Sequence, residues 1–123
     1  MAIDGEESVY VVEDDEPLRD SLAALFESEG LAVTSFASGE AFLAHYHPGG
    51  PACLVLDLDL PGDGGAELMT IVGAREHHIP VIILTGKTDP ATRARALALG
   101  AASVFVKPTN PNLLVASVRQ SLR

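Results

Sequence analysis

Five short stretches rich in apolar residues divide the chain, and each is followed by a longer segment with apolar residues at helical spacing. These stretches lie at residues 9–12, 31–36, 52–57, 80–84 and 103–106. A short unbroken apolar run is typical of a strand buried on both faces of a parallel sheet. In the segment after the first stretch, Leu18, Leu22, Leu25 and Phe26 fall on one helical face. The pattern predicts five strands that alternate with five helices.

Capping residues and prolines mark where the predicted helices begin and end. Pro17 suits the first turn of the first helix, and Gly30 suits the position just after its end. Ser38 is a typical N-cap for the second helix. The pairs Asp89–Pro90 and Asn110–Pro111 combine an N-cap with a proline in the first turn. They predict the starts of the fourth and fifth helices.

The order of the elements favours one fold class. Alternation of strand and helix produces a parallel sheet with helices on both faces, and the crossovers are right-handed. We therefore predict an α/β fold, a doubly wound five-stranded parallel sheet of the flavodoxin-like (βα)5 type with strand order 2-1-3-4-5. In this order the topological switch point lies between the first and third strands. Ligands of such sheets bind beyond the carboxyl ends of the strands.

Length and composition are those of one domain. The chain has 123 residues, of which 47% are hydrophobic, enough for a single packed core. We expect one domain over residues 1–123, with its core at about 8–122. Residues 1–8 are acidic and lack the basic and apolar regions of a secretory signal, and no apolar stretch is long enough to span a membrane. These features predict a cytoplasmic protein with no membrane partner. Cys53, in the third apolar stretch, is expected to be a buried structural thiol.

Charge is distributed unevenly along the chain. The formal net charge is -9, which argues against direct binding of nucleic acid, because phosphate contacts need a cationic surface. Residues 1–40 carry eleven of the seventeen acidic residues, whereas residues 90–123 carry five basic residues and no acidic ones. Solvated helix faces explain most such charge runs. A surface for docking a partner is the alternative.

Polar groups stand where the predicted strands end. They are Glu13 and Asp14 after the first strand, Asp57 and Asp59 at the third, Thr85 at the fourth, and Lys107 at the fifth. The first and third strands are adjacent in the predicted order, about 4.8 Å apart, so their carboxylates would crowd one another. Such crowding raises a carboxylate pKa unless a cation lies between the groups. Mg²⁺ prefers such oxygen ligands together with phosphate oxygens, and a lysine and a threonine hydroxyl suit a phosphoryl group.

The simplest chemistry that uses all these groups is phosphoryl transfer to Asp57. A carboxylate can act as a nucleophile and form an aspartyl phosphate. Positioning and charge neutralisation then dominate the reaction. In this hypothesis Mg²⁺ screens the carboxylates, Lys107 pairs with one phosphoryl oxygen, and Thr85 donates a hydrogen bond to another.

The ordered set of these residues resembles a known family. It comprises Glu13–Asp14, Asp57 followed by Pro61 and Gly65, Thr85–Gly86, and Lys107–Pro108. It is similar to the receiver domain of bacterial two-component response regulators, and the resemblance runs from about Val9 to Leu122. Each motif alone is weak, whereas the ordered set is highly specific.

The resemblance implies a role for each residue. Asp57 would be the phosphoacceptor, Thr85 the switch hydroxyl, and Lys107 the phosphate-pairing lysine, with a cis Lys107–Pro108 bond. Mg²⁺ would be held by Asp14, by Asp57, by Glu13 through a water, and by the main-chain carbonyl of Asp59.

The resemblance also implies partners. The phosphoryl donor would be a sensor histidine kinase or a phosphotransfer protein. The output would pass to a downstream effector, or to self-association through the 89–123 face. The domain would be a phosphorylation switch in phosphorelay signalling that assists its own phosphorylation and dephosphorylation, and not an enzyme with a separate substrate.

Four positions depart from the family's pattern or vary within it, among them Thr109, which stands where Phe often follows the Lys-Pro. Val104 stands where the family usually has an aromatic residue, and Phe105 is its neighbour on the opposite face of the strand. Asp59 and Lys87 occupy variable positions that tune the lifetime of the phosphoryl group. Our hypothesis at this point is that the Asp59 and Lys87 side chains pair across the mouth of the site.

Two other classes of function remain as alternatives. Asp57-Leu58-Asp59 also resembles the Asp-x-Asp motif of haloacid-dehalogenase-type phosphatases, which likewise form an aspartyl phosphate. In that family the motif lies on the first strand, and an acidic pair follows the lysine; here the acidic pair comes first. The second alternative is a receiver-like module that interacts with proteins independently of phosphorylation.

Overall fold

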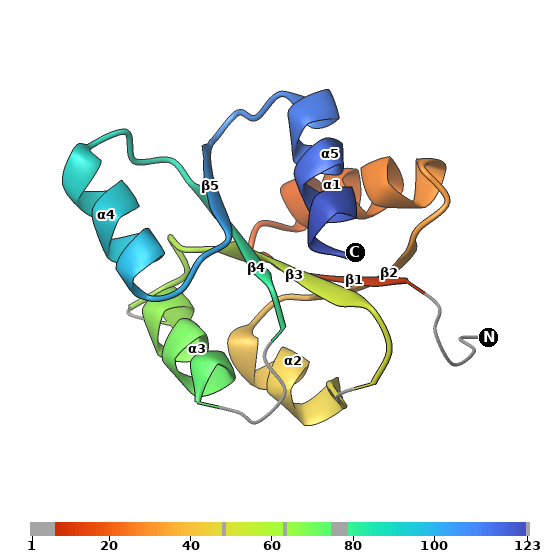
Figure 1. Cartoon of the computed structure of the whole chain (residues 1–123), viewed down its shortest axis with the longest axis horizontal. Coiled ribbons are helices and arrows are strands. Elements are labelled where there is room, and N and C mark those ends of the chain that lie inside the picture. The colour runs from red at the N-terminus through yellow and green to blue at the C-terminus, as the bar shows by residue number, and fades with distance from the viewer. Residues whose placement is uncertain (1–6, 48, 63, 75–78, 123) are drawn as a thin grey trace.

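The computed structural model describes residues 7–47, 49–62, 64–74 and 79–122. Its strands are β1 (Ser8–Val12), β2 (Ala32–Phe36), β3 (Ala52–Asp57), β4 (Val81–Thr85) and β5 (Ser103–Val106). All pair in parallel in the order β2-β1-β3-β4-β5, which confirms the predicted doubly wound sheet (Figure 1). The predicted strands agree with the observed ones to within about one residue at each end. The expectation for residues 1–6 lies outside the described part of the chain.

The helices begin largely where capping residues predict. They are α1 (Glu16–Ser28), α2 (Gly39–His45), α3 (Gly64–Gly73), α4 (Pro90–Ala98) and α5 (Pro111–Ser121). The side chains of Asp15, Ser38, Asp89 and Asn110 each accept a hydrogen bond from a backbone N–H of the following first turn. These bonds satisfy amides that have no partner within the helix. No helix in the described ranges is both long and apolar enough to cross a membrane.

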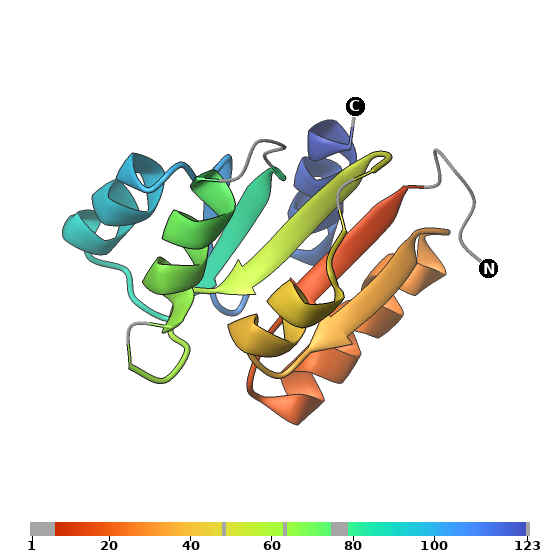
Figure 2. The same ribbon diagram turned by 90° about the horizontal axis from the view of Figure 1, so that it is seen from below.

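Two hydrophobic layers enclose the sheet, because successive strand residues face opposite sides. Figures 1 and 2 show α1 and α5 on one face and α2, α3 and α4 on the other. Val9, Cys53 and Ile82 belong to the layer beneath α1 and α5. Leu54 and Ile83 belong to the layer beneath α2, α3 and α4. Each strand is thus held from both sides, and its carboxyl end is fixed relative to its neighbours.

Strand β3 is buried from Cys53 to Asp57. The Cys53 thiol is fully buried, and this burial raises its pKa to about 12, as expected for a structural thiol. In the strand register, Val12 pairs with Leu56 and Asp57 pairs with Leu84. The residues that follow these three strands therefore emerge side by side at one edge of the sheet.

The turn from β3 into α3 depends on a glycine without a side chain. A Cβ atom added to Gly65 would lie 2.8 Å from the Leu58 carbonyl oxygen and 3.1 Å from that of Asp57. Both neighbours are backbone atoms at the end of the buried strand β3 or directly after it, so they have little freedom to move. Gly65 is itself buried, and its close packing positions the loop that carries Asp59.

We predict that Gly65→Ala destabilises the protein by about 1–3 kcal/mol, the usual cost of overpacking. Gly73, on the same helix, has no atom within 4 Å of an added Cβ. Gly73→Ala is therefore the matched control, with no loss and a gain of up to about 1 kcal/mol. Urea unfolding of the two variants checks the comparison. Equal effects would contradict the close approach at residue 65.

Candidate functional site

The candidate site lies at the carboxyl edge of the sheet, where β1, β3 and β5 end. Glu13 follows β1, Asp57 ends β3, and Lys107 follows β5. The Lys107 amine lies 3.2 Å from Oε1 of Glu13 and 3.1 Å from Oδ1 of Asp57. The two carboxyl groups are almost fully buried, with 1% and 3% exposure, and Lys107 is 25% exposed. Three residues that are far apart in the sequence therefore form one ionic cluster.

The backbone holds Lys107 in this position. Its N–H donates to the Thr85 carbonyl oxygen at 2.8 Å, which continues the pairing of β5 with β4. The Lys107–Pro108 peptide bond is cis, as the resemblance implied.

Burial and charge shift the ionisation of this cluster. Desolvation raises the pKa of Glu13 to about 7, and its hydrogen bond with Asp57 adds to the rise. The charge of Lys107 acts in the opposite direction on that group. For Lys107, burial lowers the pKa, but the hydrogen bond and charge of Asp57 and the charge of Glu13 outweigh it, so the pKa is raised. The ammonium group is therefore retained at neutral pH.

Three carboxylates in this cluster fit a divalent cation. Glu13, Asp14 and Asp57 can each offer an oxygen, and these oxygens lie within 4.8 Å of one another. Glu13 Oε2 accepts from the Asp15 N–H at 3.2 Å. Oε1 of Glu13 is buried, and within the described ranges its contact with Lys107 does not meet hydrogen-bond geometry. A buried carboxylate oxygen that lacks a hydrogen-bond partner suits a cation, or a water bound to a cation. Carboxylate oxygens and water are ligands that Mg²⁺ prefers.

Arg19 of α1 contacts the backbone of the acidic residues that follow β1. Its guanidinium donates to the Glu13 carbonyl oxygen at 2.9 Å and contacts that of Asp14 at 3.5 Å. These bonds keep residues 13 and 14 in place while their carboxylates face the site.

Thr85 and Asp59 form a second contact between strand ends. The Thr85 hydroxyl, 1% exposed, donates to Asp59 Oδ1 at 2.8 Å, and the Gly86 N–H donates to Asp59 Oδ2 at 2.6 Å. The Asp59 N–H in turn donates to Asp57 Oδ1 at 2.8 Å. Among the described residues, Asp59 forms no ion pair with Lys87, so the expected pairing of these two side chains was wrong. The Asp59 carboxylate instead accepts hydrogen bonds from Thr85 and Gly86, at the end of β4 and in the loop that follows it.

Sequence reasoning treated the Asp59 side chain as a tuning group at most and missed this contact. A signal for it existed in the strand order. Because Asp57 pairs with Leu84, residues just beyond these two positions face each other across the sheet edge.

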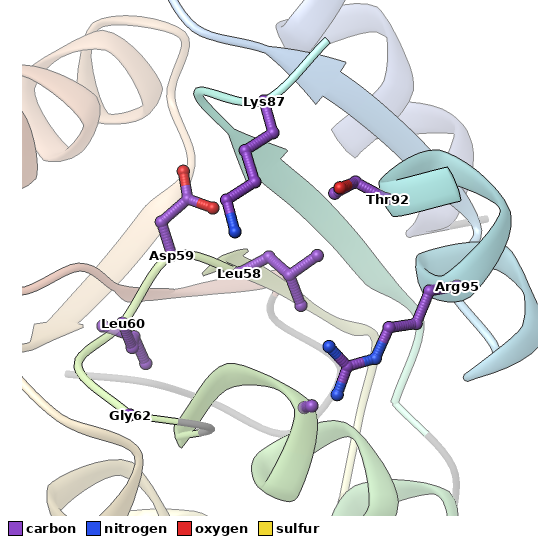
Figure 3. Close-up of a pocket in the computed structure, with 8 residues that line it drawn as sticks. Leu58, Asp59, Leu60, Gly62, Lys87, Thr92 and Arg95 are labelled. Atoms are coloured by element: carbon purple, nitrogen blue, oxygen red, sulfur yellow. The ribbon is translucent and has the colours of Figure 1, made fainter. Parts of the chain in front are cut away.

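A small cavity borders this contact. Its volume is about 250 Å³, and it is lined by Leu58, Asp59, Leu60, Gly62, Ala66, Lys87, Thr92 and Arg95. Figure 3 shows the Lys87 side chain reaching across it beside Asp59, with Arg95 extending from α4 on the far side. Asp59 thus separates the ionic cluster from a cavity with two cationic side chains.

The residues at the usual aromatic position behave as the strand alternation predicts. Val104 lies in the layer beneath α2, α3 and α4, while Phe105 packs on the opposite layer. Arg93 of α4 donates to the Val104 carbonyl oxygen at 3.2 Å. Phe105 is therefore not on the face of β5 where the family's aromatic residue stands.

The comparisons with known proteins agree with this geometry. The sequence profile of the response regulator receiver domain matches residues 9–119. The chain belongs to this family: it is a receiver domain of two-component response regulators, which is a signalling domain. Of the three functional classes that the sequence left open, the assignment favours the receiver domain over the haloacid-dehalogenase-type phosphatase and the phosphorylation-independent module.

Individual relatives support the same family. Transcriptional regulatory protein FixJ of Azorhizobium caulinodans is 43% identical over 114 residues, which cover 93% of this chain and 54% of the relative. The chain spans about half the length of the curated relatives that it matches.

Solved structures give the same result. The crystal structure of FixJ-N aligns with a TM-score of 0.85 and 33% identity over 94% of this chain and 93% of that one. The BeF3-activated DrrB receiver domain aligns with a TM-score of 0.84 and 27% identity over 95% and 97% of the two chains.

The raised pKa of Glu13 predicts a pH dependence of stability in metal-free solution. The folded carboxyl titrates near pH 7, and the unfolded one near its ordinary value of 4.5. The folded state therefore binds more protons between these values, and this contribution to stability is lost as pH rises from about 4.5 to 7. The loss is at most about 3 kcal/mol.

Glu13→Gln should remove this loss, so its unfolding free energy should fall less than that of the wild type between pH 5 and 7. Urea unfolding in the presence of a chelator measures it. Glu40→Gln, which removes an exposed carboxyl on α2, is the control and should follow the wild type. Parallel curves for all three proteins would contradict the assignment.

Proposed function

We propose that Asp57 accepts a phosphoryl group from a phosphohistidine of a sensor histidine kinase or a phosphotransfer protein. The observation that carries the proposal is the Lys107 amine, held between the buried carboxylates of Asp57 and Glu13. An ammonium group in that place neutralises negative charge where a phosphoryl group would arrive. Family membership supports the same role.

The geometry suggests how Asp57 would react. Lys107 and the Asp59 N–H both approach Oδ1 of Asp57. We therefore assign the attack to Oδ2. Its lone pair forms the new O–P bond while the P–N bond of the phosphohistidine breaks and its electron pair returns to the imidazole. Lys107 then pairs with a phosphoryl oxygen, and the Thr85 hydroxyl donates to another.

The acidic residues hold the metal ion in this proposal. Asp14, Asp57 and the main-chain carbonyl of Asp59 would be the direct protein ligands of Mg²⁺, and Glu13 would hold it through a water. When bound, Mg²⁺ neutralises the charge of the carboxylates and of the phosphoryl oxygens.

Family membership supports a proposal for the wider role. We propose that residues 1–123 form one receiver domain, located in the cytoplasm, that assists its own phosphorylation and dephosphorylation without a separate substrate. Its output passes to a downstream effector or to self-association through the 89–123 face. Exposed Leu97, Val106 and Leu113 on that face support an interaction there.

We predict that acetyl phosphate and Mg²⁺ add one phosphoryl group to the protein, as measured by intact mass. Asp57→Ala should remove the adduct, because it removes the attacking oxygen. Asp20→Asn, at an exposed position of α1, is the control and should be phosphorylated like the wild type. An adduct that survives Asp57→Ala would refute the assignment of the phosphoacceptor.

We predict a separate effect of Mg²⁺ on stability. At a free concentration about 100 times Kd, the ion should stabilise the wild type by about 2.7 kcal/mol. Asp14→Asn should lose most of this gain, and Asp20→Asn should keep it. Thermal unfolding with and without Mg²⁺ measures the difference. A gain that Asp14→Asn retains in full would place the ion elsewhere.

A further inference from the structure

The carboxylate of Asp59 bridges two loops at the edge of the sheet. One oxygen accepts from the Thr85 hydroxyl at 2.8 Å, and the other accepts from the Gly86 N–H at 2.6 Å. The loop after β3 is thereby tied to the loop after β4. Both bonds end on an ionised carboxylate, which makes them stronger than bonds between neutral groups. Figure 3 shows the Asp59 side chain standing at the β3 side of the cavity that it shares with Lys87.

The Thr85 hydroxyl is fully engaged in this arrangement. A hydroxyl carries one proton and can accept further hydrogen bonds. Its proton goes to Asp59, and the Lys87 N–H donates to its oxygen at 3.1 Å. The side chain is buried, so water has little access to exchange for these partners. The hydroxyl can donate to a phosphoryl oxygen on Asp57 only after it leaves Asp59.

Asp59 is also linked to the phosphoacceptor itself. Its N–H donates to Oδ1 of Asp57, so the two residues share one short turn. A phosphoryl group on Asp57 adds negative charge close to the Asp59 carboxylate, and like charges repel. The modification thus weakens the contact that holds Thr85 and, at the same time, offers the hydroxyl a new acceptor.

We propose that the Asp59 side chain is an autoinhibitory latch on Thr85. In the unphosphorylated protein it holds the Thr85 hydroxyl and the Gly86 N–H, and it competes with phosphoryl-Asp57 for the hydroxyl proton. The latch rests on the proposed function, because it acts on the switch that phosphorylation of Asp57 drives. Asp59 is a positioning residue here, and it acts through Thr85.

Beryllium trifluoride with Mg²⁺ provides a test, since this ion serves as the activating ligand in the DrrB structure. Its affinity is measured by amide NMR titration of the wild type, Asp59→Ala, Thr85→Val and the double variant. Asp59→Ala removes the bond to Thr85, the bond to Gly86 and a negative charge, whereas in the Thr85→Val background only the Gly86 bond and the charge are left to remove. The ratio of the two effects therefore isolates the hydrogen bond.

We expect Asp59→Ala to tighten binding at least about tenfold more in the Thr85 background than in the Thr85→Val background, the usual net worth of one hydrogen bond to a charged group. Equal tightening in both backgrounds would reduce the role of Asp59 to charge repulsion and its bond with Gly86, and it would overturn the latch on Thr85. Failure of the wild type to bind the ion would instead overturn the proposed function, and the latch with it.

Hydrogen exchange of the Gly86 amide in the unmodified protein gives a second readout. Asp59→Ala should accelerate it by about tenfold, because the amide loses its acceptor. Asp59→Asn preserves the size of the side chain and one carbonyl acceptor, so the Gly86 amide should exchange at an intermediate rate. This variant keeps the test valid if the alanine variant folds poorly. Lys87→Ala, which keeps the main-chain N–H, is the matched control and should leave the rate unchanged. Exchange as slow in Asp59→Ala as in the wild type would overturn the latch.

Discussion

The site depends on one ammonium group placed between two buried carboxylates. The side chains of Glu13 and Asp57 are almost fully buried, and the Lys107 amine lies within 3.2 Å of a carboxylate oxygen of each. Burying a charge without a partner is costly, and removing one member of a buried pair commonly destabilises a protein by about 3–5 kcal/mol. Burial raises the pKa of Glu13, and when both carboxyl groups are ionised a single lysine leaves one negative charge in excess. This excess is what makes the cluster receptive to a further cation.

The sheet order is what makes that interaction possible. The three residues lie at the carboxyl ends of β1, β3 and β5, which are separated by long stretches of sequence. The parallel register ends all three strands at the same edge. The hydrophobic layers on both faces fix the strands. The packing of the strands therefore brings the polar groups beyond them together, and contacts between the polar groups are not needed for this. A site built in this way is preorganised by apolar packing.

The sequence was sufficient to predict the fold and the meeting of these groups, for a physical reason. Apolar stretches and capping residues such as Asp89 and Asn110 act locally, and parallel topology then determines which strand ends coincide. The side-chain partner of Asp59 could not be predicted in the same way. Thr85 and Gly86 donate to this exposed carboxylate while Lys87 lines the same cavity, so the choice of partner depends on the conformation of the loops. The electrostatic attraction to Lys87 was overestimated, because an exposed ion pair gains little over water.

The residues of the ionic cluster are far apart in the sequence, so they are made at different times during translation. Glu13 and Asp57 leave the ribosome well before Lys107, and β5 must add to the edge of the sheet before the amine reaches them. An incomplete chain would carry the two carboxylates without the ammonium that neutralises them. The ionic cluster is therefore completed only after β5 has been made, and truncated products that lack β5 would lack the ammonium group at this edge, even if their first four strands were folded.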